Sequence, residues 1–205
     1  MRRLALVAVA LLPVLALGQD AAPQLQEDPR AAKFRDVERG FFVGVEAGYL
    51  GFMNTPTADK AKYSLAGDSG GRGGGFLLGA NVGADLGSRL SMALFAQGGE
   101  VTAGANYGAF SLVSVGVDAR FAFHSWRDRN DWQRLFTYVH ARGAWGKSYP
   151  EGLFGTNDVF LSGGVGIDYF TKLRHFSVGA AADAVYATTA KAFGVAIYPT
   201  VRYTF

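Results

Sequence analysis

The chain has 205 residues, a formal net charge of +3 and no cysteine. This length fits one domain. The net charge is too small to indicate a nucleic-acid-binding protein. The lack of cysteine excludes a disulfide framework, a thiol nucleophile and a thiolate metal site. The 28 glycines, 16 phenylalanines and 9 tyrosines favour a protein rich in β-strands and turns.

Residues 1–18 predict a secretory signal peptide, because two arginines precede the apolar run Leu4–Leu17 and the small residue Gly18. A membrane anchor is the alternative, but it needs a longer apolar run. We predict cleavage after Gly18. Residues 19–39 are polar and charged, with two prolines, and are predicted to form a periplasmic leader.

From Gly40 onward the chain repeats segments in which apolar residues alternate with small or polar ones. Successive side chains of a β-strand point to opposite faces, so this spacing predicts strands with one apolar face. The predicted strands are residues 41–50, 75–85, 90–97, 113–123, 135–145, 159–169, 176–186 and 193–205.

Eight strands with apolar outer faces predict an all-β, antiparallel transmembrane barrel over residues 40–205, with both termini in the periplasm. In lipid a sheet has to close, because every backbone group needs a partner within the protein. A soluble barrel of lipocalin type is the structural alternative, with its apolar residues inside. The longest predicted outer loop, Asn54–Arg72, would shield the barrel mouth or contact the cell's surroundings.

The last predicted strand carries Val201, Tyr203 and Phe205 at alternate positions. This pattern resembles the carboxy-terminal assembly signal of outer-membrane barrels, which implies the barrel-assembly machinery as a partner. An edge strand of a soluble sheet is the alternative. The strand pattern of Gly40–Phe205 resembles the small barrels of OmpA and OmpX type, which implies a location in outer-membrane lipid.

The faces predicted to point inward collect acidic and basic residues in nearly equal number. They are Glu46, Asp85, Asp118, Arg120, His140, Arg142, Asp168, Asp183 and Arg202. Eight strands leave room only for side chains, so we predict a network of paired charges that closes the lumen. The alternative is a gated conduit or a proton-responsive network around His140.

The connection His124–Arg134 is predicted to be a long, charged periplasmic turn. It carries Trp126, Arg127, Arg129, Trp132 and Arg134. These residues suit either the docking of a periplasmic partner or anchoring at the membrane interface, where tryptophan lies at headgroup level.

No catalytic, cofactor-binding or metal-binding residue is predicted. An acyl-transfer site needs a nucleophile, a base and an orienting acid, and none of the three histidines is predicted at the outer rim with a serine and a carboxylate. The glycine-rich run at residues 70–75 precedes a strand rather than a helix, so it is no phosphate loop.

The stretch Gln26–Pro56 is similar to a small barrel protein of the myxobacterial adventurous gliding machinery, the Cgl class. This resemblance implies a non-catalytic part of a motility and adhesion complex, with periplasmic and outer-membrane motility proteins as partners. The sequence thus predicts a structural or interaction component of the envelope. A small pore and a lipid-modifying enzyme are the alternatives.

Overall fold

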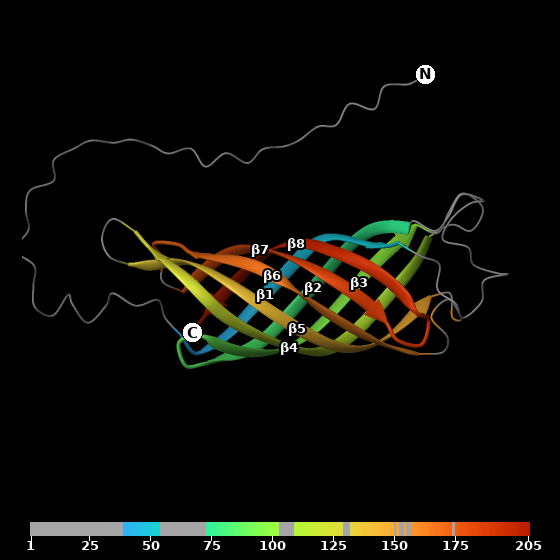
Figure 1. The fold of residues 1–205 in the computed structure, drawn as a ribbon, viewed down its shortest axis with the longest axis horizontal. Helices are drawn as coiled ribbons and strands as arrows, with labels where there is room; N and C mark the ends of the chain where they lie inside the picture. Colours follow the sequence, from blue (N-terminus) through green and yellow to red (C-terminus); the bar gives the residue numbers. More distant parts are fainter. Residues whose placement is uncertain are drawn as a thin grey trace, which may run out of the picture. The chain divides into compact units, whose positions relative to one another are not determined.

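The computed structural model describes residues 39–53, 73–102, 109–128, 132–149, 151, 154, 157–173 and 175–205. These residues form a closed antiparallel barrel in which each strand pairs with its neighbours in chain order (Figure 1). The strands are β1 (Phe41–Phe52), β2 (Gly73–Leu86), β3 (Leu90–Thr102), β4 (Ala109–Arg127), β5 (Gln133–Tyr149), β6 (Asp158–Phe170), β7 (Phe176–Ala187) and β8 (Ala192–Thr204). The predicted fold class is therefore confirmed.

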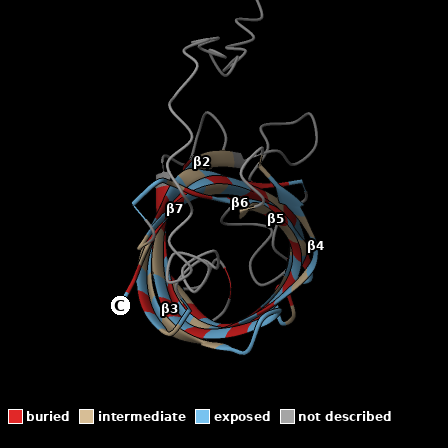
Figure 2. Cartoon of the chain, turned by 90° about the vertical axis from the view of Figure 1, so that its left-hand side faces the viewer, coloured by how far each residue is buried: buried red, intermediate tan, exposed pale blue. Residues whose placement is uncertain are grey.

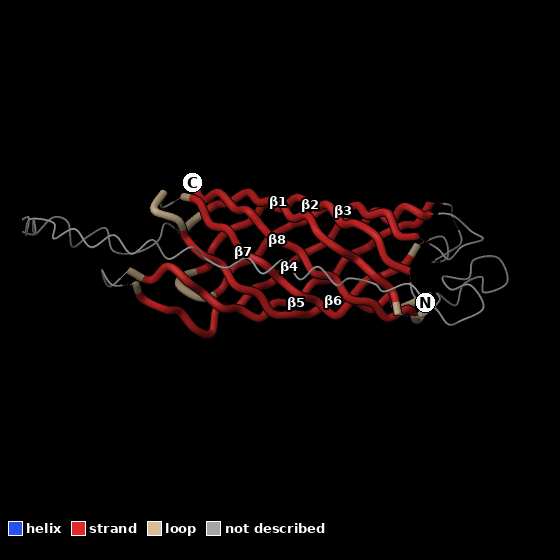
Figure 3. Tube along the Cα trace, turned by 90° about the horizontal axis from the view of Figure 1, so that it is seen from above, coloured by secondary structure: helices blue, strands red, loops and turns tan. Residues whose placement is uncertain are grey.

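The described part of the chain consists of strands and the turns between them (Figure 3). Within it, no helix has the length and hydropathy to cross a membrane. The start of β1 and the end of β8 lie at the same end of the barrel, because Phe42 pairs with Thr204. The predicted signal peptide, most of the predicted leader and the loop Asn54–Arg72 lie outside the described residues.

The outer surface of the barrel is apolar in the middle of every strand. Buried and exposed residues alternate around the wall (Figure 2), and the exposed set includes Leu94 at 62%, Val165 at 57% and Ile197 at 57%. A water-soluble protein rarely leaves so large an apolar surface uncovered. The outer face is therefore built to contact lipid rather than water.

Exposed aromatic side chains gather at the two ends of this apolar surface. At the end that holds the termini they are Phe41, Phe121, Phe123, Trp126, Tyr169, Phe176 and Phe205, and at the opposite end Tyr49, Phe76, Trp145, Tyr149, Tyr186 and Phe193. On β1, the eight residue steps from Phe41 to Tyr49 span about 20 Å of depth at a strand tilt of about 40°. Two aromatic girdles at such a spacing are typical of a membrane-spanning barrel.

Strands β4 and β5 are longer than predicted. They carry the hairpin past the other strands at the end where the termini lie (Figure 1). The predicted long turn His124–Arg134 is thus wrong in extent, because β4 continues to Arg127 and β5 begins at Gln133. A bulge between Ala122 and His124 shifts the register and breaks the alternation, so the segment had the pattern of a turn.

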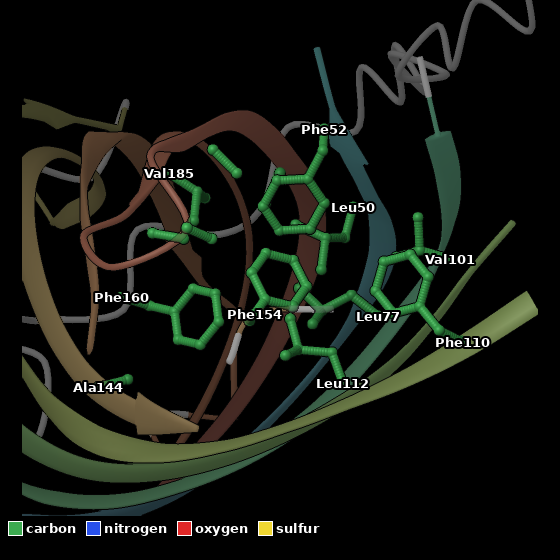
Figure 4. Close-up of a cluster of buried hydrophobic side chains, with 14 of the residues drawn as sticks. Leu50, Phe52, Leu77, Val101, Phe110, Leu112, Ala144, Phe154, Phe160 and Val185 are labelled. Carbon is green, nitrogen blue, oxygen red and sulfur yellow. The ribbon is translucent and has the colours of Figure 1, made fainter. Parts of the chain in front are cut away.

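The lumen is divided into two zones along the barrel axis. Charged residues occupy the middle and the end near the termini, and apolar residues occupy the end with the longer connections. In the apolar zone, the Phe154 ring lies between the rings of Phe52 and Phe160, at centroid distances of 5.2 and 5.4 Å (Figure 4). We call the buried apolar residues of this zone the apolar plug. They include Leu50, Phe52, Leu77, Phe95, Val101, Phe110, Leu112, Phe154, Phe160 and Val185.

The turn between β7 and β8 is fixed by the buried carboxylate of Asp158 at the start of β6. The backbone N–H groups of Thr189 and Ala190 donate to it at 2.8 and 2.9 Å, and the Thr188 hydroxyl donates at 3.2 Å. Hydrogen bonds to an ionised acceptor are stronger than neutral ones. Asp158 therefore holds this turn against the end of the barrel above the apolar plug.

Replacing Asp158 with alanine is expected to lower the free energy of unfolding by about 1.5–3 kcal/mol, because several donors lose one charged acceptor. Equilibrium unfolding in micelles measures this loss, and hydrogen exchange at the amides of Thr189 and Ala190 should accelerate. Asn157→Ala, at the exposed neighbouring position, is the control and should change neither. If the two variants unfold alike, Asp158 does not hold the turn.

Candidate functional site

The polar zone of the lumen is organised by the register of β4 and β5. Asp118 lies directly opposite Arg142, and Arg120 lies directly opposite His140. All four side chains point inward and are buried. Arg120 Nε donates to Asp118 Oδ2 at 2.8 Å along the same strand. We call Glu46, Asp118, Arg120, His140, Arg142, Asp183 and Tyr198 the lumen network.

Arg142 is at the centre of the lumen network. Its two terminal nitrogens donate to the two carboxylate oxygens of Glu46 on β1, at 2.9 and 2.8 Å, and Nη2 also lies 3.3 Å from Asp118 Oδ2. The guanidinium is flanked by the rings of Phe95 and Tyr198, at 4.9 and 5.0 Å from their centroids. A bidentate ion pair of this kind fixes the relative orientation of the two side chains and also pairs their charges. Arg142 therefore ties β5 to β1 across the lumen.

His140 reaches two carboxylates on different strands. Nδ1 lies 3.3 Å from Asp118 Oδ1, and Nε2 lies 2.7 Å from Asp183 Oδ1 on β7. Gly164 of β6 stands between His140 and Asp183 in the register, and a Cβ there would overlap the Asp183 carboxylate. A glycine is thus required for this close approach. The Tyr198 hydroxyl donates to Asp183 Oδ2 at 2.9 Å and completes the row.

A second group of charges lies nearer the end that holds the termini. Arg202 Nη2 donates to Asp85 Oδ2 on β2, and the guanidinium lies 3.6 Å from the centroid of the Phe42 ring. Asp168 is buried there, beside a cavity of about 40 Å³ that is also lined by Arg120 and Arg202. The structure thus divides the predicted inward charges into two neighbouring groups.

The residues predicted at the long turn lie at the projecting hairpin. Trp126 and Arg127 belong to β4 and Arg134 belongs to β5, while Trp132 lies directly before β5. The Asp128 carboxylate accepts from the Trp132 backbone N–H at 3.0 Å and pairs with Arg134 at 3.0 Å. Arg129 lies outside the described residues.

The residues of the predicted assembly signal lie on the outer side of β8. Val201 and Phe205 are exposed and Tyr203 is half-buried. The Tyr203 ring packs edge-on against Phe176 and Phe205, with centroids 4.9 and 5.0 Å apart. They form part of the aromatic girdle at this end. Their recognition by an assembly machine stays a prediction.

The side chains of the lumen network are arranged in ion pairs and hydrogen bonds. His140 contacts two carboxylates, which leaves its ring nitrogens engaged in ion-pair geometry. Across the residues with described positions, no group of three or more His, Cys, Asp or Glu side chains is placed to hold a metal ion. Besides the cavity near Arg202, a space of about 20 Å³ is lined by residues of both the lumen network and the apolar plug.

Two parts of this arrangement were missed by the sequence reasoning. The apolar plug was missed because Leu50, Leu77 and Phe95 share their strand faces with polar residues and glycines. Phe154 lies in a predicted loop, where no periodicity marks it as buried. The sequence gives little sign of the turn that Asp158 holds. The signs are the Asp158 carboxylate at the start of an apolar strand and the Thr188–Thr189 pair about 30 residues later.

Comparison with known proteins gives a likeness in fold. No model of a protein family matches the chain, and no curated protein matches it by sequence. Neisserial surface protein A is similar in structure, with a TM-score of 0.60 and 19% identity over 81% of this chain and 97% of that one.

Two proteins of Pseudomonas aeruginosa give weaker likenesses. The outer membrane protein OprG has a TM-score of 0.46 and 10% identity, over 83% of this chain and 99% of its own. The N-terminal β-barrel domain of OprF has a TM-score of 0.45 and 16% identity, over 81% of this chain and 100% of its own. Both TM-scores are below 0.5, so the fold comparison depends on the Neisserial protein. Together with the apolar outer face and its two aromatic girdles, the fold is that of a small eight-stranded barrel of the bacterial outer membrane.

Proposed function

We propose that this barrel is a non-enzymatic structural and interaction component of the cell envelope. The observation that carries the proposal is the filled lumen. The lumen network and the apolar plug follow one another along the axis. A cavity of about 20 Å³ lies between them, and one of about 40 Å³ lies beside Asp168 and Arg202. A water molecule needs about 10–15 Å³ of such space, so the two cavities hold a few waters at most and no column along the whole lumen.

The barrel is expected to show no ion conductance. Insertion into planar bilayers at about 100 mV measures this directly, because a water-filled pore gives discrete current steps and a filled lumen does not. If charge reversal at Arg142 gave current steps that the wild type lacks, the result would agree with a lumen that the network closes. Regular current steps in the wild-type protein would contradict the proposal and favour the pore.

We infer the orientation of the barrel from the lengths of its connections. Outer-membrane barrels have short periplasmic turns and longer extracellular loops. The turn at residues 87–89 after β2 lies at the end that holds the termini, and the connection at residues 53–72 after β1 lies at the other. In this orientation the termini and the β4–β5 hairpin face the periplasm.

Within this function we propose a place in a gliding-motility and adhesion complex. The support is the resemblance of Gln26–Pro56 to the Cgl class, together with a hairpin that projects at the proposed periplasmic end. Photo-crosslinking from position 126 in intact cells should recover envelope proteins, and deletion of the gene should impair surface movement. Recovery of lipid alone, with normal movement, would contradict this part of the proposal.

A further inference from the structure

Among the described strands, none pairs with one side of the projecting part of β4. Pairing between β3 and β4 ends at Leu90 and Phe121, while β4 continues to Arg127. The last described backbone hydrogen bond on this side runs from Ala122 N–H to the Arg89 carbonyl oxygen, at 2.7 Å. We call Phe123–Trp126 the β4 overhang. From the geometry of the overhang we infer that it takes up an extended acidic peptide of a partner protein as an added strand.

The main chain of the overhang directs hydrogen-bonding groups to the open side. Residues along a strand turn their N–H and C=O groups alternately to the two neighbours. The bulge at Phe123 places one extra residue opposite β5. Counted from Ala122, whose N–H points toward β3, the next residue to face the open side is therefore Ser125. Such an edge is a template for another extended chain.

A hollow lies beside the overhang, between the β2–β3 turn and the first residues of β5. Its volume is about 310 Å³, and it is lined by Ser88, Arg89, Ala122, Phe123, His124, Ser125, Gln133 and Phe136. An added strand along the open edge of β4 would border this space, because the hollow is lined by Arg89 and by Ala122–Ser125. The open edge and the hollow together thus define a groove for an extended peptide.

The charge of the groove indicates the chemistry of the peptide. Among the described residues that line it, Arg89 is the cation, and none is a carboxylate. Acidic side chains on the incoming strand would therefore find a complementary surface. A second copy of this chain is the alternative occupant, and its pairing through the overhang would appear as self-association. A lipid headgroup has no backbone to satisfy the edge.

This inference rests on the proposed function and specifies how the hairpin meets a partner. The test uses the full chain folded in micelles of a zwitterionic detergent. The probe is a fluorescently labelled peptide of alternating valine and glutamate, and anisotropy measures its binding. A peptide with the same side chains but N-methyl groups along one edge should bind at least about tenfold more weakly, because it lacks donors for the open edge. A peptide with lysine in place of glutamate should weaken by a similar factor.

Two variants at one position separate the backbone from the side chain. Ser125→Pro removes the backbone donor on the open side and should weaken binding at least about tenfold, while Ser125→Ala keeps that donor and should stay within about twofold of the wild type. The heat-dependent gel migration of the folded barrel checks that both variants fold. The peptide comparisons need no variant, so they decide the question even if Ser125→Pro does not fold.

Several outcomes would overturn the inference. Two of them concern the peptide: equal binding of the N-methylated peptide, and equal binding of the probe by folded Ser125→Pro. The other two are displacement of the bound probe from the chain by phosphatidylglycerol vesicles, and self-association of the chain that Ser125→Pro abolishes. If crosslinking from position 126 still recovers envelope proteins in Ser125→Pro cells, the proposed function stands and strand addition fails. Ion conductance would overturn the proposed function whether or not the peptide binds.

Discussion

Replacement of Arg142 with alanine is expected to lower the free energy of unfolding in micelles by about 3–5 kcal/mol. The variant would strand the carboxylate of Glu46, which accepts two hydrogen bonds from Arg142, and would remove one cation from Asp118. Both carboxylates are almost fully buried. A buried charge that loses its partner carries a desolvation cost that nothing offsets. Equilibrium unfolding in urea measures the change.

The control for this variant is Arg89→Ala, because Arg89 is an exposed arginine near the end of the barrel. A surface substitution of this kind changes stability by no more than about 0.5 kcal/mol. The double variant Glu46→Gln, Arg142→Met removes both ions of the pair and should recover part of the stability, since no unpaired carboxylate remains on β1. Equal stability of Arg142→Ala and Arg89→Ala would show that the lumen network does not hold the barrel together.

Replacement of Leu94 with arginine is expected to cost about 2–4 kcal/mol, the range for a cation on the lipid face at the bilayer midplane. Leu94 lies in the middle of β3 with its side chain on the outer surface. The new guanidinium would have to be buried in hydrocarbon or drawn to the headgroups, and both are unfavourable. Unfolding of the barrel in lipid vesicles measures the cost.

The matched control is Leu90→Arg, on the same face of the same strand. Four residues correspond to about 10 Å of depth in a tilted strand, which places Leu90 near the interface. The cost there should be no more than about 1 kcal/mol. In a water-soluble barrel an arginine at the exposed Leu94 would be nearly neutral, so equal and small effects at both positions would contradict a lipid-facing outer surface.

The fold could be predicted from the sequence because every outward position along the wall faces the same environment. Lipid requires an apolar side chain at each outward position, so Val113, Val115 and Val117 repeat with a period of two. The same alternation assigned Asp118, Arg120 and Arg142 to the inward face. Strand pairing in the structure agrees with both assignments.

The alternation of side chains could not predict which charged residues of the lumen pair with one another. The ion pair of Arg142 with Glu46 joins residues that are 96 positions apart. Its geometry depends on closure of the barrel and on small residues such as Gly164 along the wall, rather than on local spacing. The inward face also changes from polar to apolar along the axis, and an average over each strand conceals that change.

The β4–β5 hairpin differed from the prediction for a local reason. Charged residues and tryptophans from His124 to Arg134 have the composition of an exposed turn. In the structure, backbone pairing continues through the bulge and turns this composition into an extension of two strands. Side-chain patterns predict strands that pack against a lipid or a core, and they are less informative for a hairpin beyond the wall of the barrel.

The central claim is that the apolar face of the wall contacts lipid while the charges point inward. The chain has no cysteine, so single spin labels can be placed at positions 90, 92, 94 and 96 of β3 without a background signal. We expect collision rates with oxygen to peak, and those with a water-soluble nickel complex to reach a minimum, at position 94 in lipid bilayers. Higher collision rates with nickel than with oxygen at position 94 would contradict the account.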